Sequence, residues 1–377
     1  MRKILFIVSI LLFFKINFSQ KNYFQQEVNT YIDVSLNDKK HELNAFEKIE
    51  YINNSPYKLD SLIIHLWPNA YKNINTALAK HDLENGELNF RFSDIKDKGF
   101  IDSLNFISNN KKLNWSYYNK HIDIAVIYLN ETLLPGDTTV ITTPFRVKIP
   151  LGVYSRLGHI GQSYQITQWF PKPAVFDKNG WHPIPYLSQG EFYSEFGSYD
   201  VKINLPENYV VGATGDLVNN AKELDFLNNR VKATNLIIEA NGPQDYDLSF
   251  PKSSNTFKTL HYHQENVHDF AWFADKRYHV LKGEIELPVS KRKVDTWAMF
   301  TNNEFDLWES AITHINDATY NYSLWVGEYP YNHVTAVDGS ISAGGGMEYP
   351  NITVIGESGN NYFHDEVITH EVGHNWF

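Results

Sequence analysis

The periodicity of the apolar residues changes near residue 300, and this change divides the chain into two parts of different fold class. Segments that alternate polar with apolar residues, or that are rich in β-branched residues, recur before it at 31–36, 62–67, 122–129, 140–149 and 199–205. Both patterns are typical of strands. Many short strands with few helical stretches predict an all-β domain over residues 21–290, in the form of a sandwich or a barrel-like sheet.

Helical spacing begins after this β-rich part. The segment 301–304, Thr-Asn-Asn-Glu, has the form of a capping box, in which the first and last side chains each bond the other residue's backbone amide. Apolar residues then recur at three- and four-residue steps over 305–322, which predicts one amphipathic helix that ends before Gly327. Two short strands are expected at 334–337 and 352–355.

The strongest chemical signal is His370-Glu371-Val372-Gly373-His374, near the end of the sequence. Positions four apart lie on one face of a helix, so His370 and His374 would present two imidazoles to one point with Glu371 beside them. Neutral imidazoles bind zinc, and a carboxylate near the metal can take a proton from water that the cation has acidified. The pattern therefore predicts a zinc cofactor held by His370 and His374, with Glu371 as the general base of a hydrolysis.

A glycine-rich segment, 342–350, precedes this motif. Consecutive glycines leave the backbone uncovered, which suits a strand edge that a bound peptide must approach closely. Glu348 follows the glycines, and a carboxylate beside a zinc site could hold the free α-amino group of a peptide. The other interpretation is an ordinary glycine-rich loop with a solvated glutamate.

Together the two motifs resemble those of the M1 metallo-aminopeptidases, a family that includes the leukotriene A4 hydrolases. The family motif G-x-M-E-N appears as Gly345-Gly346-Met347-Glu348-Tyr349, with tyrosine in place of asparagine, and the zinc motif H-E-x-x-H runs from His370 to His374. The resemblance implies that Glu348 anchors the substrate amine and that the backbone of Gly345, Gly346 and Met347 aligns the peptide. It also implies a saddle-shaped β-domain followed, over 291–377, by the truncated front half of an α+β thermolysin-like catalytic domain.

Two elements of the family pattern do not occur in this sequence. The family's third zinc ligand is a glutamate on the next helix, and its oxyanion-stabilising tyrosine lies further on, whereas the sequence ends at Phe377. Catalytic zinc sites normally use three protein ligands. We therefore expect the chain to be the N-terminal portion of a longer enzyme, and expect this portion alone to bind zinc weakly and not to turn over.

Two glutamines of the β-rich part are further candidates for the site. In the family, a glutamine of the N-terminal domain helps to bind the first substrate residue, and Gln162 and Gln165 are both in a suitable region. Their spacing does not decide between them. The alternative for each is an ordinary polar loop residue near a buried Trp169.

The N-terminal segment and the composition bear on localisation and partners. Residues 1–20 have the form of a signal peptide, with Arg2 and Lys3 before an apolar core too short to span a bilayer, although an uncleaved anchor is a second interpretation. We expect an exported protein, periplasmic or secreted, with no stable membrane insertion after cleavage. The net charge of −11 and the lack of a basic cluster exclude nucleic acid as an expected partner, and the absence of cysteine excludes thiolate metal sites.

Three functions are consistent with these residues. The first is a zinc-dependent aminopeptidase acting on peptides with a free N-terminus. The second is a non-catalytic M1-like binding or scaffold protein, or an inactive fragment. An intact set of two histidines and two glutamates favours the enzyme, because a binding module does not require them on one helix face. An endopeptidase is a third function, which Glu348 opposes because it would block passage of a chain through the cleft.

Overall fold

The computed structural model describes residues 23–218, 221–339 and 345–376. The predicted signal peptide at 1–20 therefore lies outside the described residues, as do residues 342–344 of the glycine-rich segment and Phe377. Among the helices that are described, none is long and apolar enough to cross a membrane.

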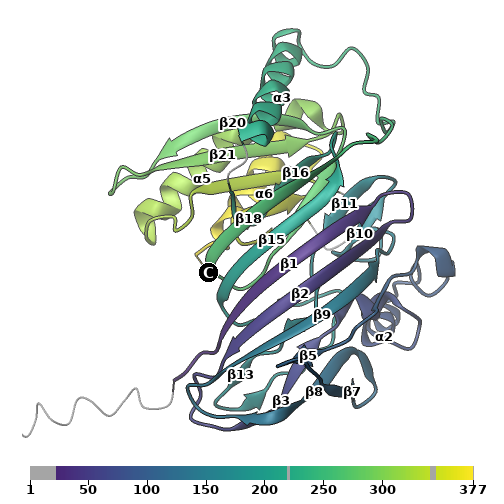
Figure 1. Cartoon of the computed structure of the whole chain (residues 1–377). Coiled ribbons are helices and arrows are strands. Elements are labelled where there is room, and N and C mark those ends of the chain that lie inside the picture. The colour runs from purple at the N-terminus through teal and green to yellow at the C-terminus, as the bar shows by residue number, and fades with distance from the viewer. Residues whose placement is uncertain (1–22, 219–220, 340–344, 377) are drawn as a thin grey trace, which may run out of the picture.

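Within the described residues, the largest sheet has nine strands, and its long strands form the face of the molecule seen in Figure 1. Strands β1 and β15 run parallel, and the other pairs are antiparallel. In sheet order the strands are β17 (Asp216–Leu217), β18 (Phe257–Val267), β15 (Gly197–Pro206), β1 (Glu27–Asn37), β2 (Glu42–Ile52), β9 (Thr138–Lys148), β5 (Ile107–Ser108) and β6 (Lys111–Lys112), with β4 (Phe100–Asp102) also paired to β9.

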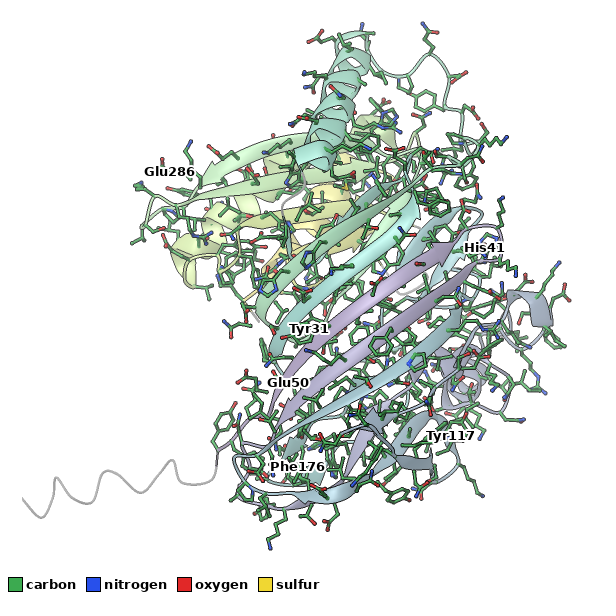
Figure 2. The ribbon with its side chains drawn as sticks, viewed as in Figure 1. Tyr31, His41, Glu50, Tyr117, Phe176 and Glu286 are labelled. Carbon is green, nitrogen blue, oxygen red and sulfur yellow. The ribbon has the colours of Figure 1, made fainter. Side chains whose placement is uncertain are left out.

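The alternation in the sequence explains why this sheet has one buried face. Val34 on β1 is fully buried, whereas Tyr31 on the same strand is 38% exposed. Tyr31 and Glu50 of β2 lie on the outer face, labelled in Figure 2, where the Lys48 ammonium sits 3.7 Å from the centre of the Tyr31 ring. Strands of period two thus turn their apolar residues inward.

Smaller sheets complete the β-rich part, and residues of both four-stranded sheets share a core with the large sheet. In the described residues one four-stranded sheet has the order β10 (Gly158–Ile160), β11 (Ser163–Ile166), β19 (Trp272–Asp275), β16 (Val210–Ala213); the other has β12 (Lys172–Pro173), β3 (Leu59–His65), β8 (His121–Leu133), β7 (Asn114–Tyr118); a pair joins β13 (Phe176–Asp177) and β14 (Gly180–Trp181). The five predicted strand segments lie in β1, β3, β8, β9 and β15, although 62–67 runs past the end of β3 into a 3₁₀ turn.

The helices of this part include one that the sequence analysis overlooked. The described helices are η2 (Trp67–Tyr71), α2 (Ala77–Glu84), η3 (Ile95–Asp97) and α3 (Ala221–Glu239). Helix α3 projects at the top of Figure 1 and packs against β20. Only a narrow stripe of it is buried, with Leu227 and Thr234 among the covered residues, so its apolar periodicity is weak. A helix with so narrow a buried face is hard to recognise from periodicity alone.

The second part of the chain is a five-stranded sheet with helices. Its described elements are β20 (His279–Glu286), β21 (Lys293–Phe300), β22 (His333–Asp338), β24 (Ile352–Ile355) and β23 (Gly346–Tyr349) in sheet order, with helices α4 (Phe305–Trp308), α5 (Ala311–Trp325) and α6 (Asn361–Gly373). Strand β20 pairs along its length with β21, so this sheet begins before residue 290, the boundary expected from sequence.

Strand β21 shows how this sheet joins the two parts. Ala298 and Phe300 face the core that holds α5 and α6, whereas Trp297 and Met299 face a second core that includes Phe273 of β19. A side chain at Gly212 of β16 would contact residues of this sheet at about 3 Å, because the two layers approach closely there. The sheet is therefore covered by helices on one face and by the β-rich part on the other.

The predicted capping box at 301–304 is wrong. Thr301 instead donates through its hydroxyl to Asp338 Oδ2 at 2.6 Å, and the Glu304 carboxylate accepts from the amides of Ser358 and Gly359. Glu304 has a left-handed conformation and makes no capping bond. The cap does not form because both side chains bind tertiary partners instead. The expected single helix is two helices in the structure, α4 and α5.

Candidate functional site

Helix α6 brings the two histidines of the zinc motif together. Its first turn is capped by Asn360, whose side chain accepts from the amide of Phe363 at 2.9 Å. Three turns later, the Nε2 atoms of His370 and His374 lie 3.2 Å apart. Two nitrogens bound to one tetrahedral zinc at about 2.0–2.1 Å would be about 3.3 Å apart. Burial and then the charge of His370 lower the pKa of His374, which favours the neutral form that binds metal.

Glu371 lies on the side of α6 that faces strand β23. Its side chain is buried, with 5% of the residue exposed, and burial followed by the charge of Glu191 raises its pKa to about 7. A Cβ at Gly346 would stand 2.5 Å from Glu371 Oε1, so only glycine permits this approach of strand and carboxylate. Glu371 Oε2 is buried and accepts no hydrogen bond from a described residue, so it is available to a water or a ligand.

Glu348 faces a carboxylate from the β-rich part that the sequence analysis missed. Burial raises the pKa of Glu348 to about 8, together with a hydrogen bond to Glu191, the charge of Glu191 and that of Glu371. A raised pKa favours the neutral form of the Glu348 carboxyl at neutral pH, in which it can donate to a carboxylate beside it. Glu191 lies in an irregular segment between β14 and β15, and nothing in its local sequence marks it as a site residue.

The structure allows two choices of metal ligands. Of the described residues, Glu348, Glu371 and His374 form the one group of three potential ligands, with ligand atoms within 4.8 Å of one another. The predicted pair is His370 with His374. We favour the histidine pair, because its nitrogen spacing matches zinc geometry and because Glu348 is already engaged with Glu191.

The two candidate glutamines lie in different surroundings. Gln162 bonds Asp38 and Ser253 and accepts from the Lys276 ammonium, so its side chain is committed to a network in the β-rich part. Gln165 is 4% exposed, and its Oε1 would lie 2.8 Å from a Cβ at Gly339, the last described residue before the glycine-rich segment. Of the two, only Gln165 is brought against the sheet that carries Glu348.

Strand β23, which carries the predicted exopeptidase motif, packs against buried residues of α6 and of the β-rich part. A Cβ at Gly345 would come within 3.0 Å of Val367 on α6, and Met347 belongs to the core between the two parts. Tyr349, at the position where the family has asparagine, donates to Gln168 Oε1 at 3.4 Å. Gln168 in turn donates to Asp269, which pairs with the buried Lys172. Tyr349 thus links the strand to polar groups in the β-rich core.

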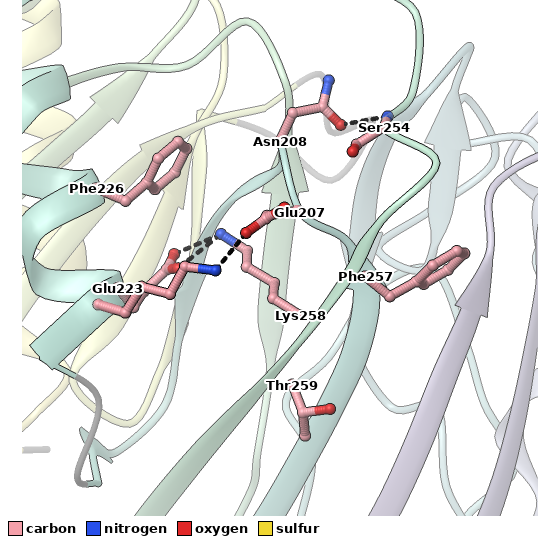
Figure 3. A pocket seen from close by; sticks show the side chains of 9 residues that line it. Glu207, Asn208, Glu223, Phe226, Ser254, Phe257, Lys258 and Thr259 are labelled. Carbon is pink, nitrogen blue, oxygen red and sulfur yellow. Dashed lines mark hydrogen bonds and ion pairs between the residues drawn. The ribbon is translucent and has the colours of Figure 1, made fainter.

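A separate pocket beside α3, of about 520 Å³, lies between the helix and the β15–β18 edge (Figure 3). The Lys258 ammonium lies 2.6 Å from Glu223 Oε1 and 4.3 Å from the centre of the Phe226 ring. At the rim, Lys222 pairs with Glu207 at 2.5 Å. Each charged side chain that lines this pocket has a partner of opposite sign. We therefore do not assign the candidate site to this pocket.

The fold is similar to solved structures of M1 zinc metallopeptidases. The enzyme of Deinococcus radiodurans matches with a TM-score of 0.54 at 12% identity, over 96% of this chain and 66% of that one. A mutant from the same organism bound to a Tyr-Ser-Ala substrate matches with a TM-score of 0.53 at 11% identity, over 95% of this chain and 65% of that one. No family model and no curated protein matches the sequence.

These comparisons define the class of fold. The chain is β-rich with few helices among its described residues, and it has a peptidase-like fold consistent with the N-terminal part of an M1 metallopeptidase. It spans 65–66% of the length of the structures it matches. At 12% identity the similarity extends to the fold and not to the chemistry.

Proposed function

We propose that this chain belongs to a zinc-dependent aminopeptidase that removes N-terminal residues from peptides. The observation that supports the proposal is the convergence of five side chains from three parts of the chain, namely α6, β23 and the segment before β15. His370 and His374 on α6 turn two nitrogens to one point, Glu371 lies beside them, and Glu348 on β23 meets Glu191 from the β-rich part. A hydrolase is the coarse class in which such a constellation occurs.

Each residue has a role that its surroundings suit. Zinc, when bound, supplies a Lewis acid that acidifies water and polarises the scissile carbonyl. His370 and His374 would hold it. Glu371, with a pKa near 7 and a free buried oxygen, would take the proton from the attacking water and hand it to the leaving amine. The exposed backbone next to Gly346 would align the peptide.

The carboxylate pair explains why the free N-terminus would be selected. With its pKa raised to about 8, the Glu348 carboxyl would keep its proton at neutral pH in the unliganded protein. A protonated α-amine could take the place of that proton and interact with both oxygens. An N-blocked peptide has a neutral amide at the same place, so it would not gain this charged interaction with the two carboxyl groups. Gln165 is proposed as a neighbour of the bound N-terminal residue.

The remaining functional expectations are also proposals. Export to the periplasm or the medium rests on the sequence of residues 1–20, and the peptide partner rests on the site. The third metal ligand is proposed to come from outside the residues described. A non-catalytic relative would bind peptides at the same carboxylate pair without cleaving them.

The decisive experiment uses the protein at its natural length with zinc added. It is incubated with a tripeptide that has a free amine and with the same tripeptide N-acetylated, and released amino acids are quantified. We expect release of the first residue from the free peptide alone, with loss of activity in a chelator and recovery with zinc. Binding without release would support the scaffold function, and cleavage of the acetylated peptide would indicate an endopeptidase.

A further inference from the structure

Arg156 is a buried arginine whose contacts cannot be explained by an ordinary ion pair. Only 4% of the residue is exposed. Its acceptors among the described residues are the carbonyls of Leu187 and Gly190, at 3.4 and 3.2 Å, and the sulfur of Met347 at 3.0 Å. A guanidinium held by neutral groups in the interior is costly and persists only where the surrounding structure compensates for it.

The positions of these acceptors connect Arg156 to the carboxylate pair. Gly190 immediately precedes Glu191, and Met347 immediately precedes Glu348. Phe192 immediately follows Glu191 in the sequence, and the guanidinium carbon of Arg156 lies 5.0 Å from the centre of the Phe192 ring. One planar, rigid donor therefore contacts both segments that carry the pair, one from each part of the chain.

Arg156 lies in a tightly folded backbone segment that leads into β10, and this segment fixes its position. A Cβ at Gly158 would lie 2.2 Å from Gly152 Cα, so the backbone folds back on itself around residues 152–158. The Tyr186 hydroxyl, which bonds Ser155, also accepts from the backbone amide of Arg156. The guanidinium is thus held at a rigid base, which a positioning group requires.

We propose that Arg156 is a positioning residue that sets the separation of Glu191 and Glu348 and so makes the site selective for a free α-amine. This inference rests on the proposed function for its catalytic consequence. Its structural statement, that Arg156 holds the segments 187–192 and 346–349 together, is independent of activity. A shift of about 1 Å in a positioned group can change a rate by about two orders of magnitude.

The test compares Arg156→Met and Arg156→Lys with Arg230→Met. Arg230 is a matched control, because it also donates to a backbone carbonyl and stacks on an aromatic ring but belongs to α3. In Arg156→Met we expect KM for a free-amine tripeptide to rise about tenfold, with inhibition by the N-acetylated tripeptide changed less than about threefold. Arg156→Lys should recover part of the loss, and Arg230→Met should match the wild type.

Amide hydrogen exchange supplies a readout that does not depend on turnover. Peptides covering 187–192 and 346–349 should exchange faster in Arg156→Met and not in Arg230→Met. Unchanged exchange in both segments overturns the proposal, as does an equal loss for free and acetylated peptides. If Arg156→Met fails to fold, Arg156→Lys is judged by the same two measurements. A wild-type protein without aminopeptidase activity removes the proposed function, whereas the exchange result still decides whether Arg156 joins the segments.

Discussion

Carboxyl groups gather both in the pocket beside α3 and at the candidate site, and the two places differ in the charges that surround these groups. Beside α3, Glu223 pairs with Lys258 and Glu207 pairs with Lys222. At the candidate site, the charges that act on the pKa values of Glu348 and Glu371 are those of other carboxylates. The pocket beside α3 has a volume of about 520 Å³, yet its charges are balanced within the protein.

The difference distinguishes a structural contact from a binding site. A paired charge has its partner already, and a ligand could interact with it only by separating the pair. Carboxylates brought together without a cation keep protons at neutral pH and are poised to bind a cation or an ammonium group instead. Charge balance, more than the size of a hollow, therefore points to the glutamates on α6, β23 and the segment before β15.

The largest expected effect is on catalysis. Glu371→Gln keeps the shape that Gly346 accommodates but removes the base, so the rate of peptide hydrolysis should fall by about 10³-fold or more. Bound zinc, measured by atomic absorption, should be unchanged because both histidines remain. Nearly normal turnover in a zinc-loaded variant would assign the base to another residue.

Substitutions in the pocket beside α3, where the charges are paired, should change the stability of the protein and not its activity. Lys258→Met removes the cation paired with the buried Glu223, and the free energy of unfolding should fall by about 3 kcal/mol in urea titration. The double variant Lys258→Met, Glu223→Gln should be more stable than Lys258→Met, because no uncompensated charge remains. A change in substrate selectivity in either variant would contradict the distinction between a structural pocket beside α3 and a separate candidate binding site.

Asp338 shows the effect of burial on a carboxyl group that is bound by neutral hydrogen-bond donors. Asp338 is held by donors from Thr301, and burial raises its pKa to about 6. Its unfolded pKa is about 3.9, so the folded state binds more protons between these values and the stability falls as pH rises from about 4 to about 6. A difference of about two between the folded and unfolded pKa corresponds to at most about 3 kcal/mol, because one pKa unit is worth about 1.4 kcal/mol.

Asp338→Asn tests this window, because the amide oxygen can accept from Thr301 but does not titrate. Denaturant unfolding at intervals from pH 4 to 7 should show a smaller decline for Asp338→Asn than for the wild type. Asp295→Asn, at a carboxylate whose side chain is 43% exposed on β21, is the control. Parallel curves for wild type and Asp338→Asn would show that burial of Asp338 has no net effect on stability.

The smallest expected effect concerns the pair itself. Glu191→Gln keeps a hydrogen-bonding group beside Glu348 but removes one charge, so KM for free-amine peptides should rise about tenfold, or about 1.4 kcal/mol. Binding of N-acetylated peptides should be unchanged or tighter, as measured by inhibition. Asp177→Asn, in the β-rich part, is a control that should change neither constant. Equal weakening of both ligands would place Glu191 outside the amine site.

Much of the fold was predictable from local pattern. Strands at 31–36, 122–129, 140–149 and 199–205 lie in β-strands of the structure, because period-two alternation reports a half-buried strand directly. Helix α3 was not predictable in this way, because its buried face is narrow. The cap expected at 301–304 is absent because its two side chains bind Asp338, Ser358 and Gly359.

The sequence by itself determined the residues of the zinc motif and their helical register, since a four-residue spacing places His370 and His374 on one face of any helix. Only the tertiary structure decided that Glu191 meets Glu348, that Gln165 and not Gln162 lies against the second sheet, and that Arg156 contacts both segments. These contacts join residues from 34 to 191 positions apart, and no local periodicity records them, because they depend on how the sheets pack.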